Sequence, residues 1–352
     1  MMACDLGTGG RLLILGLSHR TAPVEQREKA SLVDAAATSL LGILVRDPAI
    51  TEAAVLSTCN RTELYAVVAD PVSAEATLSR ALVEHSRITE DALADAKYVH
   101  RERSAARHLF RVAASLDSMV LGESEIQGQV RAARDLARHA GTLGPLLGRT
   151  FAQALATGKR VRSQTRVAAG AVSVSSVAVD LARTALGDLR DRRALLVGAG
   201  RAAEATARAL LGQGLAEIVV SNRTPATANR LAARFGGRAA GIEALAHDVA
   251  AVDVVISSTD AARTILDPHN LTRARDGVRR RPLVLIDIAV PRDVDPRVEK
   301  LPGVRLHNID DLKRVAEANL NGRRREAARA EVIVAQEVRR FASWWRRSHA
   351  RE

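Results

Sequence analysis

The chain has 352 residues, of which 47% are hydrophobic and 26% charged, values ordinary for a globular protein with a core of its own. The length suggests two or three domains. No apolar run is long enough to cross a bilayer and nothing resembles a signal peptide. The cysteines, Cys4 and Cys59, are far apart in the sequence, which makes a disulfide framework improbable. We therefore expect a cytoplasmic protein.

The net charge of +12 and the pI near 10.8 favour an anionic partner, with nucleic acid as the first candidate. The excess is mostly Arg in an Ala-rich sequence, which genomic base composition would also produce. Aromatic residues make up only 2% of the chain, so base stacking is not expected to dominate recognition. Phosphate contacts would carry most of the affinity for an RNA.

The first part of the chain has the order strand, helix, strand, strand, helix, which is typical of a small α+β domain. The turn Gly16–Pro23 ends on a proline, which suits the first turn of a helix. The expected elements are a strand at Arg11–Leu17, a helix from Pro23 toward Val45, strands at Ala53–Ser57 and Leu64–Ala69, and a helix at Val72–His85.

The stretch Leu56–Tyr65 places polar residues between two apolar runs, so these residues are expected at a strand end, where functional groups are usually carried. Cys59 lies in its centre. Only a thiolate is a good nucleophile, and a free thiol with a pKa of about 8.5 needs a cation or a base nearby. Arg61 is the candidate cation. The alternative is that Cys59 is a small buried hydrophobe.

From Glu102 the apolar residues recur at helical spacing, and His108 lies beside the stripe. A histidine here is either a packed helix residue or a proton-transfer group. The following loop, Leu116–Val130, gathers carboxylates, hydroxyls and an amide around glycines before a helix at Ile126–Ala140. Helix capping explains Ser and Glu at such a position, but not the number of other polar groups.

Helices are expected at Leu146–Ser163 and Val172–Leu186, with the basic run Gly158–Arg166 between them. This run is either a solvated surface or a strip that contacts phosphates. Spacing does not decide between the two.

A buried strand, Arg193–Val197, enters a glycine turn and an Ala/Leu-rich helix that runs to Gln213. Such glycines let the backbone approach a pyrophosphate, which the positive end of the helix binds. A second strand, Glu217–Val220, is followed by Arg223, which accommodates a 2′-phosphate and so favours NADPH. The alternative is an α/β domain with a vacant turn. The predicted cofactor residues are Gly198, Ala199, Gly200, Arg201, Ala202, Ala203, Ser221, Asn222, Arg223 and Thr224.

Two more strands, Val252–Ser257 and Leu283–Ile286, end in polar residues that would face the cofactor crevice. After Asn308–Leu312 the pattern predicts one long amphipathic helix to about Arg347, weakened in its middle by Gly322. Its apolar stripe must pack along the other domains or against a second subunit.

Taken together, these blocks resemble glutamyl-tRNA reductases, and the resemblance runs from Leu12 to Trp344. The matching blocks, in the family's order, are Gly16–Pro23, Ser57–Glu63, Leu121–Glu123, Gly128–Val130, Gly158–Arg162, Gly170–Val174, Val197–Gly200, Asn222–Thr224 and Asp287–Arg292.

The resemblance implies a multidomain α/β protein with an N-terminal α+β catalytic domain (10–157), a Rossmann-like NADPH-binding domain (158–307) and a long C-terminal helix (308–352). It implies NADPH-dependent reduction of glutamyl-tRNA to glutamate-1-semialdehyde through a thioester on Cys59, the first step of tetrapyrrole (5-aminolevulinate) biosynthesis. His108 matches a histidine important for activity, as a proton-transfer or orienting group. Arg61 suits a glutamate carboxylate. The implied substrate-binding residues are Thr58, Asn60, Arg61, Ser118, Glu123, Ser124, Glu125 and Gln129.

The sequence departs from the family at three places. Many relatives have Gln in place of Glu125, and Ala203 replaces a common third glycine, which alanine can satisfy in helix packing. Relatives continue beyond the equivalent of Glu352 into a helical dimerisation domain, so the usual homodimer is doubtful here. No metal site is expected. The aminotransferase that uses glutamate-1-semialdehyde is a candidate partner.

Two other functions fit parts of the sequence. The region Gly198–Thr224 alone suits a shikimate-dehydrogenase-like NADPH reductase of a free small molecule. A catalytically silent RNA-binding paralogue is the other alternative, but the presence of Cys59, Arg61 and His108 weighs against it.

Overall fold

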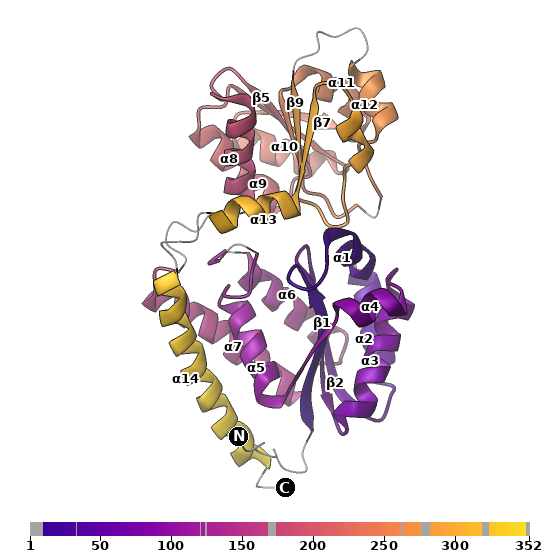
Figure 1. Ribbon diagram of the computed structural model, residues 1–352, viewed down its shortest axis with the longest axis vertical. Coiled ribbons are helices and arrows are strands. Elements are labelled where there is room, and N and C mark those ends of the chain that lie inside the picture. The colour runs from indigo at the N-terminus through magenta and orange to yellow at the C-terminus, as the bar shows by residue number, and fades with distance from the viewer. Residues whose placement is uncertain are drawn as a thin grey trace. The chain divides into compact units, whose positions relative to one another are not determined.

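The computed structural model describes residues 10–32, 34–119, 121–123, 125–167, 174–261, 263–275, 282–318 and 324–349. The described residues form two compact units (Figure 1). Unit 1 holds the residues up to 167 together with those from 324, and unit 2 holds 174–318. Within the described residues, no helix has the length and apolar character needed to cross a membrane.

Unit 1 is built on a four-stranded antiparallel sheet in the order β2-β3-β1-β4. The central strand β3 is buried along its whole length, because helices cover both faces of the sheet. Helices α2, α3 and α4 lie on one side, and α5, α6 and α7 on the other (Figure 1). The elements are β1 (Arg11–Ser18), α1 (Val24–Ala30), α2 (Asp34–Leu44), β2 (Ile50–Thr58), β3 (Arg61–Val68), α3 (Pro71–His85), α4 (Glu90–Ala96), β4 (Tyr98–Arg101), α5 (Glu102–Ala113), α6 (Ile126–His139) and α7 (Pro145–Gln164).

The predicted helix from Pro23 to Val45 is wrong, because two helices, α1 and α2, occupy this stretch. The chain leaves α1 at Ser31, whose backbone is extended. The next amide, that of Leu32, donates to the Ser57 hydroxyl at 3.0 Å instead of to a helical carbonyl. A contact with a strand far along the chain therefore ends the helix. The sequence also did not predict α4 or β4, which are short.

The C-terminal helix α14 (Arg324–His349) packs along α5 and α7 (Figure 1). Its stripe enters the same hydrophobic core as the sheet of unit 1. The buried residues of this stripe are Ala330, Ile333, Val334, Val338, Phe341 and Trp345. Helix α13 (Ile309–Ala318) instead packs on α8 (Val174–Leu186) in unit 2. The two helices thus belong to different units, and Gly322 lies outside the described residues.

The units differ from the predicted domains 10–157, 158–307 and 308–352. The boundary at 157/158 falls inside α7, whose apolar face continues to Val161 in the core of unit 1. The C-terminal segment is not separate, because α14 cannot bury its stripe alone.

Unit 2 is a six-stranded parallel sheet in the order β10-β9-β8-β5-β6-β7. The order reverses between β5 and β8, the point at which such sheets bind ligands. This confirms the Rossmann-like prediction. The elements are β5 (Arg193–Val197), α9 (Arg201–Gly212), β6 (Glu217–Asn222), α10 (Pro225–Arg234), β7 (Arg238–Gly241), η1 (Ile242–Ala244), α11 (Leu245–Ala251), β8 (Val254–Ser257), α12 (Pro268–Arg275), β9 (Leu283–Asp287), η2 (Pro296–Lys300) and β10 (Val304–Asn308).

Unit 2 is expected to lose stability as the pH rises, through the buried Asp287. Burial, reinforced by the charge of Asp293, raises the pKa of Asp287 to about 8, whereas an unfolded chain has an Asp pKa of about 3.9. Protonated Asp287 therefore stabilises the fold at low pH, and this contribution is lost as the pH rises through about 8. Urea unfolding followed by circular dichroism should give a lower midpoint at about pH 9 than at about pH 6. The Asp287→Asn variant should lose this difference between the urea midpoints at the two pH values. If the variant kept the full difference, Asp287 would not be its cause.

Candidate active site

Cys59 and Asn60 form the two-residue turn between β2 and β3, where Thr58 pairs with Arg61. This confirms the prediction of two strands around a polar turn. The turn is anchored by the block that follows β1: the His19 amide donates to the Asn60 carbonyl at 2.8 Å. Two blocks that are distant in the sequence therefore meet at one end of the sheet.

Cys59 is partly exposed at this turn, and its surroundings favour the protonated thiol over the thiolate. Burial raises its pKa to about 12, and the charges of Glu123 and Glu125 add to this effect. The cation that opposes them is Arg27 of α1, which also donates from Nη1 to the Cys59 carbonyl at 2.6 Å. Arg61 was the cation predicted from the sequence, but the structure gives Arg27 and not Arg61 as the cation that lowers the pKa of Cys59. Nothing local in the sequence pointed to Arg27.

Glu123 comes from the polar loop predicted as a second functional segment. Its backbone carbonyl accepts hydrogen bonds from Ser115 Oγ at 2.7 Å and from Arg162 Nη2 at 2.5 Å. Burial raises the pKa of its side chain to about 7, while the nearby Ser118 opposes the rise. The structure thus brings an acid that titrates near neutral pH into the electrostatic surroundings of Cys59.

The remaining predicted loop residues lie close by in the chain. Glu125 is partly exposed, and its carbonyl accepts from the amide of Gln129, also partly exposed, at 3.1 Å. Ser124 lies outside the described residues.

Asn60, in the turn beside Cys59, is 5% exposed, and its Oδ1 has no hydrogen-bond partner among the described residues.

Arg61 and His108 converge on Glu63, a residue to which sequence reasoning gave no role. Arg61 Nη1 lies 2.6 Å from Glu63 Oε1, and His108 Nε2 lies 2.8 Å from the same oxygen. Arg61 also donates from Nη2 to the Asp117 carbonyl. Both predicted residues are buried. Glu63 belongs to the polar block around Cys59. The alternating pattern of a strand does not show which charged side chains contact one another in the interior.

The nucleotide turn of unit 2 has the geometry that a dinucleotide phosphate requires. Gly198 has a φ of +104°, and a Cβ there would lie 2.9 Å from the Ser258 carbonyl oxygen, so only glycine fits. Gly200 precedes α9, and a Cβ on it would meet open space. Ala203, in place of a third glycine, is buried in the packing of α9.

The end of β6 supplies a cation beside this turn. Arg223 is exposed and makes no ion pair within the described part of the chain. Its neighbours Asn222 and Thr224 are joined by a hydrogen bond of 3.3 Å from Asn222 Nδ2 to the Thr224 carbonyl. Ser221 is buried, and its carbonyl accepts from the Gly198 amide at 2.8 Å. The Arg223 side chain therefore lies next in sequence to a strand end that is hydrogen-bonded to the glycine turn.

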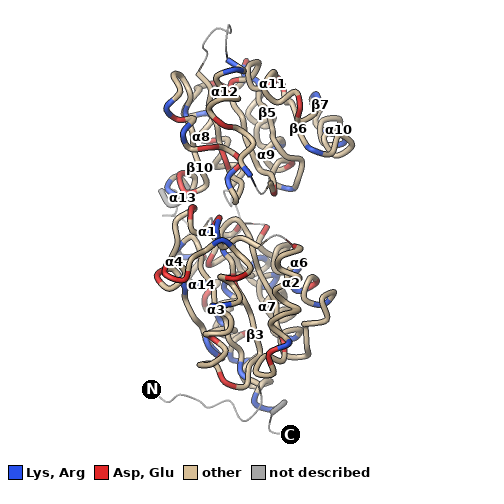
Figure 2. The backbone as a smooth tube through the Cα atoms, turned by 90° about the vertical axis from the view of Figure 1, so that its right-hand side faces the viewer, with Lys and Arg blue, Asp and Glu red and all other residues tan. Residues whose placement is uncertain are grey.

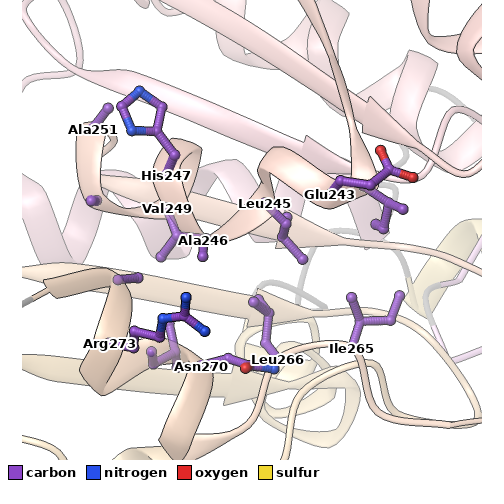
Figure 3. A pocket seen from close by; sticks show the side chains of 14 residues that line it. Glu243, Leu245, Ala246, His247, Val249, Ala251, Ile265, Leu266, Asn270 and Arg273 are labelled. Carbon is purple, nitrogen blue, oxygen red and sulfur yellow. The ribbon is translucent and has the colours of Figure 1, made fainter.

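A pocket of about 820 Å³ opens between α11 and α12 (Figure 3). Apolar side chains such as Leu245 and Leu266 line it together with His247 and Arg273. None of the residues predicted for the active site or for the cofactor lines this pocket.

Part of the predicted basic run has a structural role. Arg160 pairs with Glu337 of α14 at 2.6 Å, and Arg162 holds the Glu123 loop. Basic and acidic residues are interspersed over both units (Figure 2). Arg160 and Arg162 therefore join parts of unit 1 to one another and do not only form a charged surface.

Comparisons with known proteins agree with both units. Residues 15–165 match the family model described as glutamyl-tRNAGlu reductase, N-terminal domain, and residues 180–315 match the model described as shikimate / quinate 5-dehydrogenase. The glutamyl-tRNA reductase of Syntrophotalea carbinolica is 46% identical over 334 residues, which cover 95% of this chain and 75% of that protein. The one of Rubrobacter xylanophilus is 45% identical over 333 residues, which cover 95% and 77%.

A solved structure supports the same relationship. The glutamyl-tRNA reductase from Methanopyrus kandleri superposes with a TM-score of 0.51 at 37% identity, over 94% of this chain and 79% of that one. The sequence blocks, the fold of both units and these relatives agree. The chain belongs to the glutamyl-tRNA reductase family of oxidoreductases.

Proposed function

We propose that this chain reduces glutamyl-tRNA to glutamate-1-semialdehyde with NADPH, through a thioester on Cys59, as the first step of tetrapyrrole biosynthesis. The observation that carries the proposal is the hairpin turn that displays Cys59 at the end of the sheet, in one chain with a dinucleotide turn. Family membership supplies the substrate, because the relatives are named for glutamyl-tRNA.

In the first step the Cys59 sulfur attacks the glutamyl carbonyl. A carbon–sulfur bond forms, and the ester bond to the tRNA oxygen breaks. Because burial keeps the thiol protonated, with a pKa of about 12, a neighbouring group must accept its proton. Glu123, with a pKa of about 7, is suited to take this proton and to pass it to the departing oxygen. Covalent catalysis thus divides one difficult step into two.

In the second step the carbon–sulfur bond breaks as the carbonyl carbon is reduced, and the departing Cys59 thiolate takes up a proton from solvent. NADPH, when bound, supplies the hydride that reduces the thioester carbonyl carbon. The backbone amides from Gly198 to Ala203 would hold its pyrophosphate, and Arg223 its 2′-phosphate. The open space at Gly200 and the exposed Arg223 support this assignment.

Replacing Arg223 with alanine is expected to raise the KM for NADPH roughly ten- to a hundredfold, because a charge-assisted hydrogen bond to phosphate is lost. The KM for NADH should change little, since NADH lacks the 2′-phosphate. Steady-state kinetics with both cofactors measures the ratio of the KM for NADPH to the KM for NADH. Arg230→Ala, at an exposed arginine within α10, is the matched control. Equal effects of the two variants on NADPH would contradict the role of Arg223.

The proposed function is tested by omitting the reductant. Purified protein incubated with glutamyl-tRNA and no NADPH should accumulate a glutamyl adduct, which peptide mass spectrometry should place on Cys59 and not on Cys4. Adding NADPH should remove the adduct and release the aldehyde. Steady turnover with no adduct on Cys59 at any time would overturn the thioester route.

One observation favours a second candidate, an NADPH reductase of a free small molecule. The match of residues 180–315 to the shikimate / quinate 5-dehydrogenase model covers the nucleotide-binding unit. Deacylated tRNA separates the two functions: it should compete with the substrate of a tRNA-dependent enzyme and have no effect on a small-molecule reductase.

A further inference from the structure

The carboxylate of Asp293 joins the ends of two neighbouring strands in unit 2, β8 and β9. Asp293 lies in the chain after β9 and is 0% exposed. Its Oδ2 accepts from Ser257 Oγ at 2.6 Å and from the Thr259 amide at 2.9 Å, and its Oδ1 accepts from Thr259 Oγ1. One buried carboxylate therefore fastens the end of β8 through three hydrogen bonds.

Asp287, the last residue of β9, holds the loop that carries Asp293. Its Oδ1 accepts from the Ala289 amide at 3.0 Å, and its Oδ2 accepts from the Val294 amide at 2.8 Å. The loop is thus fastened to one side chain at its start and at its end. Because Asp293 is the residue next to Val294, its place beside β8 is fixed from the β9 side as well.

The backbone of Asp293 holds a second point of the connection that leaves β8. Its carbonyl accepts from the amides of Ile265 and Leu266, at 2.6 Å and 3.0 Å. Leu266 also pairs with Val294 in a parallel bridge. Asp293 therefore contacts this connection where it leaves β8 and again just before it enters α12.

Ser258, which lies between the two residues that the Asp293 side chain holds, packs against the nucleotide turn. Its amide donates to the Val197 carbonyl at 2.9 Å, and its carbonyl oxygen would lie 2.9 Å from a Cβ on Gly198. Ser258 and Thr259 are partly exposed, whereas Ser257 is buried. The end of β8 thus adjoins the glycine turn and leaves polar groups open to a ligand.

The order of the strands indicates which half of the cofactor would meet the end of β8. Strand β5 lies between β6 and β8. The proposed function assigns the 2′-phosphate to Arg223 after β6, and the pyrophosphate to the turn after β5. A dinucleotide bound across this edge of the sheet would therefore extend its nicotinamide half toward β8.

We propose that Asp293 is a positioning residue for the nicotinamide half of NADPH: it holds Ser258 and Thr259 in place beside the glycine turn. The inference rests on the proposed function and adds a residue to it. Because Asp293 has no exposed surface, it acts through the residues that it holds and not by touching the cofactor.

The test compares two ligands of the full chain by isothermal titration calorimetry. One is NADP⁺, and the other is adenosine 2′,5′-bisphosphate, which has the 2′-phosphate but lacks the nicotinamide half. Asp293→Ala removes all three hydrogen bonds to the end of β8, so the Kd for NADP⁺ should rise at least about tenfold, while the Kd for the bisphosphate should change by less than about twofold. A general distortion of unit 2 would weaken both ligands together. An unchanged Kd for NADP⁺, or an equal rise for the two ligands, would overturn the proposal.

Asp293→Asn should rescue the binding of NADP⁺. The amide oxygen of asparagine can accept from Ser257 and from the Thr259 amide, and its NH₂ group can donate to Thr259 Oγ1. The Kd for NADP⁺ should therefore stay within about threefold of the wild-type value. An asparagine variant as weak as Asp293→Ala would contradict a role that depends on these hydrogen bonds.

Asp248→Ala is the matched control, because Asp248 is another buried carboxylate of unit 2. It lies on α11 and pairs with Arg238 at 2.5 Å. Both Kd values should match those of the wild type. A rise for NADP⁺ as large as that of Asp293→Ala would mean that the loss of any buried carboxylate in this unit has the effect, and the proposal would fall.

If Asp293→Ala does not fold, as judged by circular dichroism, Ser257→Ala replaces it. This variant removes one of the three hydrogen bonds from a side chain that is 1% exposed. The Kd for NADP⁺ should then rise roughly three- to tenfold, with the Kd for the bisphosphate unchanged, and an unchanged Kd for NADP⁺ overturns the proposal. A wild type that binds neither ligand overturns the cofactor assignment of the proposed function itself.

Discussion

Replacing Cys59 with serine is expected to abolish the reduction of glutamyl-tRNA, with a loss of at least about a thousandfold in kcat, the scale seen when a nucleophile is removed. A serine hydroxyl is a weaker nucleophile than a thiol. An oxygen ester on serine would also be less electrophilic than a thioester, so both steps would suffer. The measurement is NADPH oxidation with glutamyl-tRNA as the substrate, together with the yield of aldehyde.

Two controls make the Cys59 result specific. Cys4→Ser, at the other cysteine of the chain, should leave turnover unchanged. NADPH binding should also survive in Cys59→Ser, because the residues proposed to hold the cofactor belong to the other unit. Normal turnover by Cys59→Ser would show that the sulfur forms no covalent intermediate.

Replacing Gly158 with alanine is expected to destabilise unit 1 by about 1–3 kcal/mol, the usual cost of overpacking. A Cβ at Gly158 would lie 2.3 Å from the Ala113 carbonyl oxygen, where α7 meets the end of α5. A backbone carbonyl cannot rotate away as a side chain can. The helices would have to separate, which outweighs the gain of up to about 1 kcal/mol in helix propensity.

Gly148→Ala in the same helix is the matched control. A Cβ at Gly148 meets only ordinary contacts, the nearest at 3.9 Å, so helix propensity should make this variant as stable as the wild type or up to about 1 kcal/mol more stable. Urea unfolding followed by tryptophan fluorescence measures the effect, because Trp344 and Trp345 lie on α14 in the same unit. Equal midpoints for the two variants would show that the approach of α5 and α7 is not as close as described.

Several parts of the site were predictable from the sequence because their signals are local. The hairpin around Cys59 follows from two apolar runs and a polar turn. The nucleotide turn follows from a buried strand, glycines and a helix, and its positive φ at Gly198 is a property of one residue. The pattern of strands and helices was enough to assign unit 2 to the Rossmann-like folds.

Other parts depend on which distant residues meet. Arg27 as the cation at Cys59, and Glu63 as the common partner of Arg61 and His108, became visible only when α1, β3 and α5 were placed together. The electrostatics of Cys59 likewise depend on burial, which its neighbours in sequence do not reveal.

The sequence by itself determined most of the strands, the nucleotide turn and the turn that carries Cys59, because periodicity and turn chemistry act over a few residues. Only the tertiary structure decided where α1 ends, which unit receives α14 and which charges are paired in the interior. The physical reason is that a buried charge or an apolar stripe is satisfied by whatever the fold brings against it, and those partners lie far away along the chain.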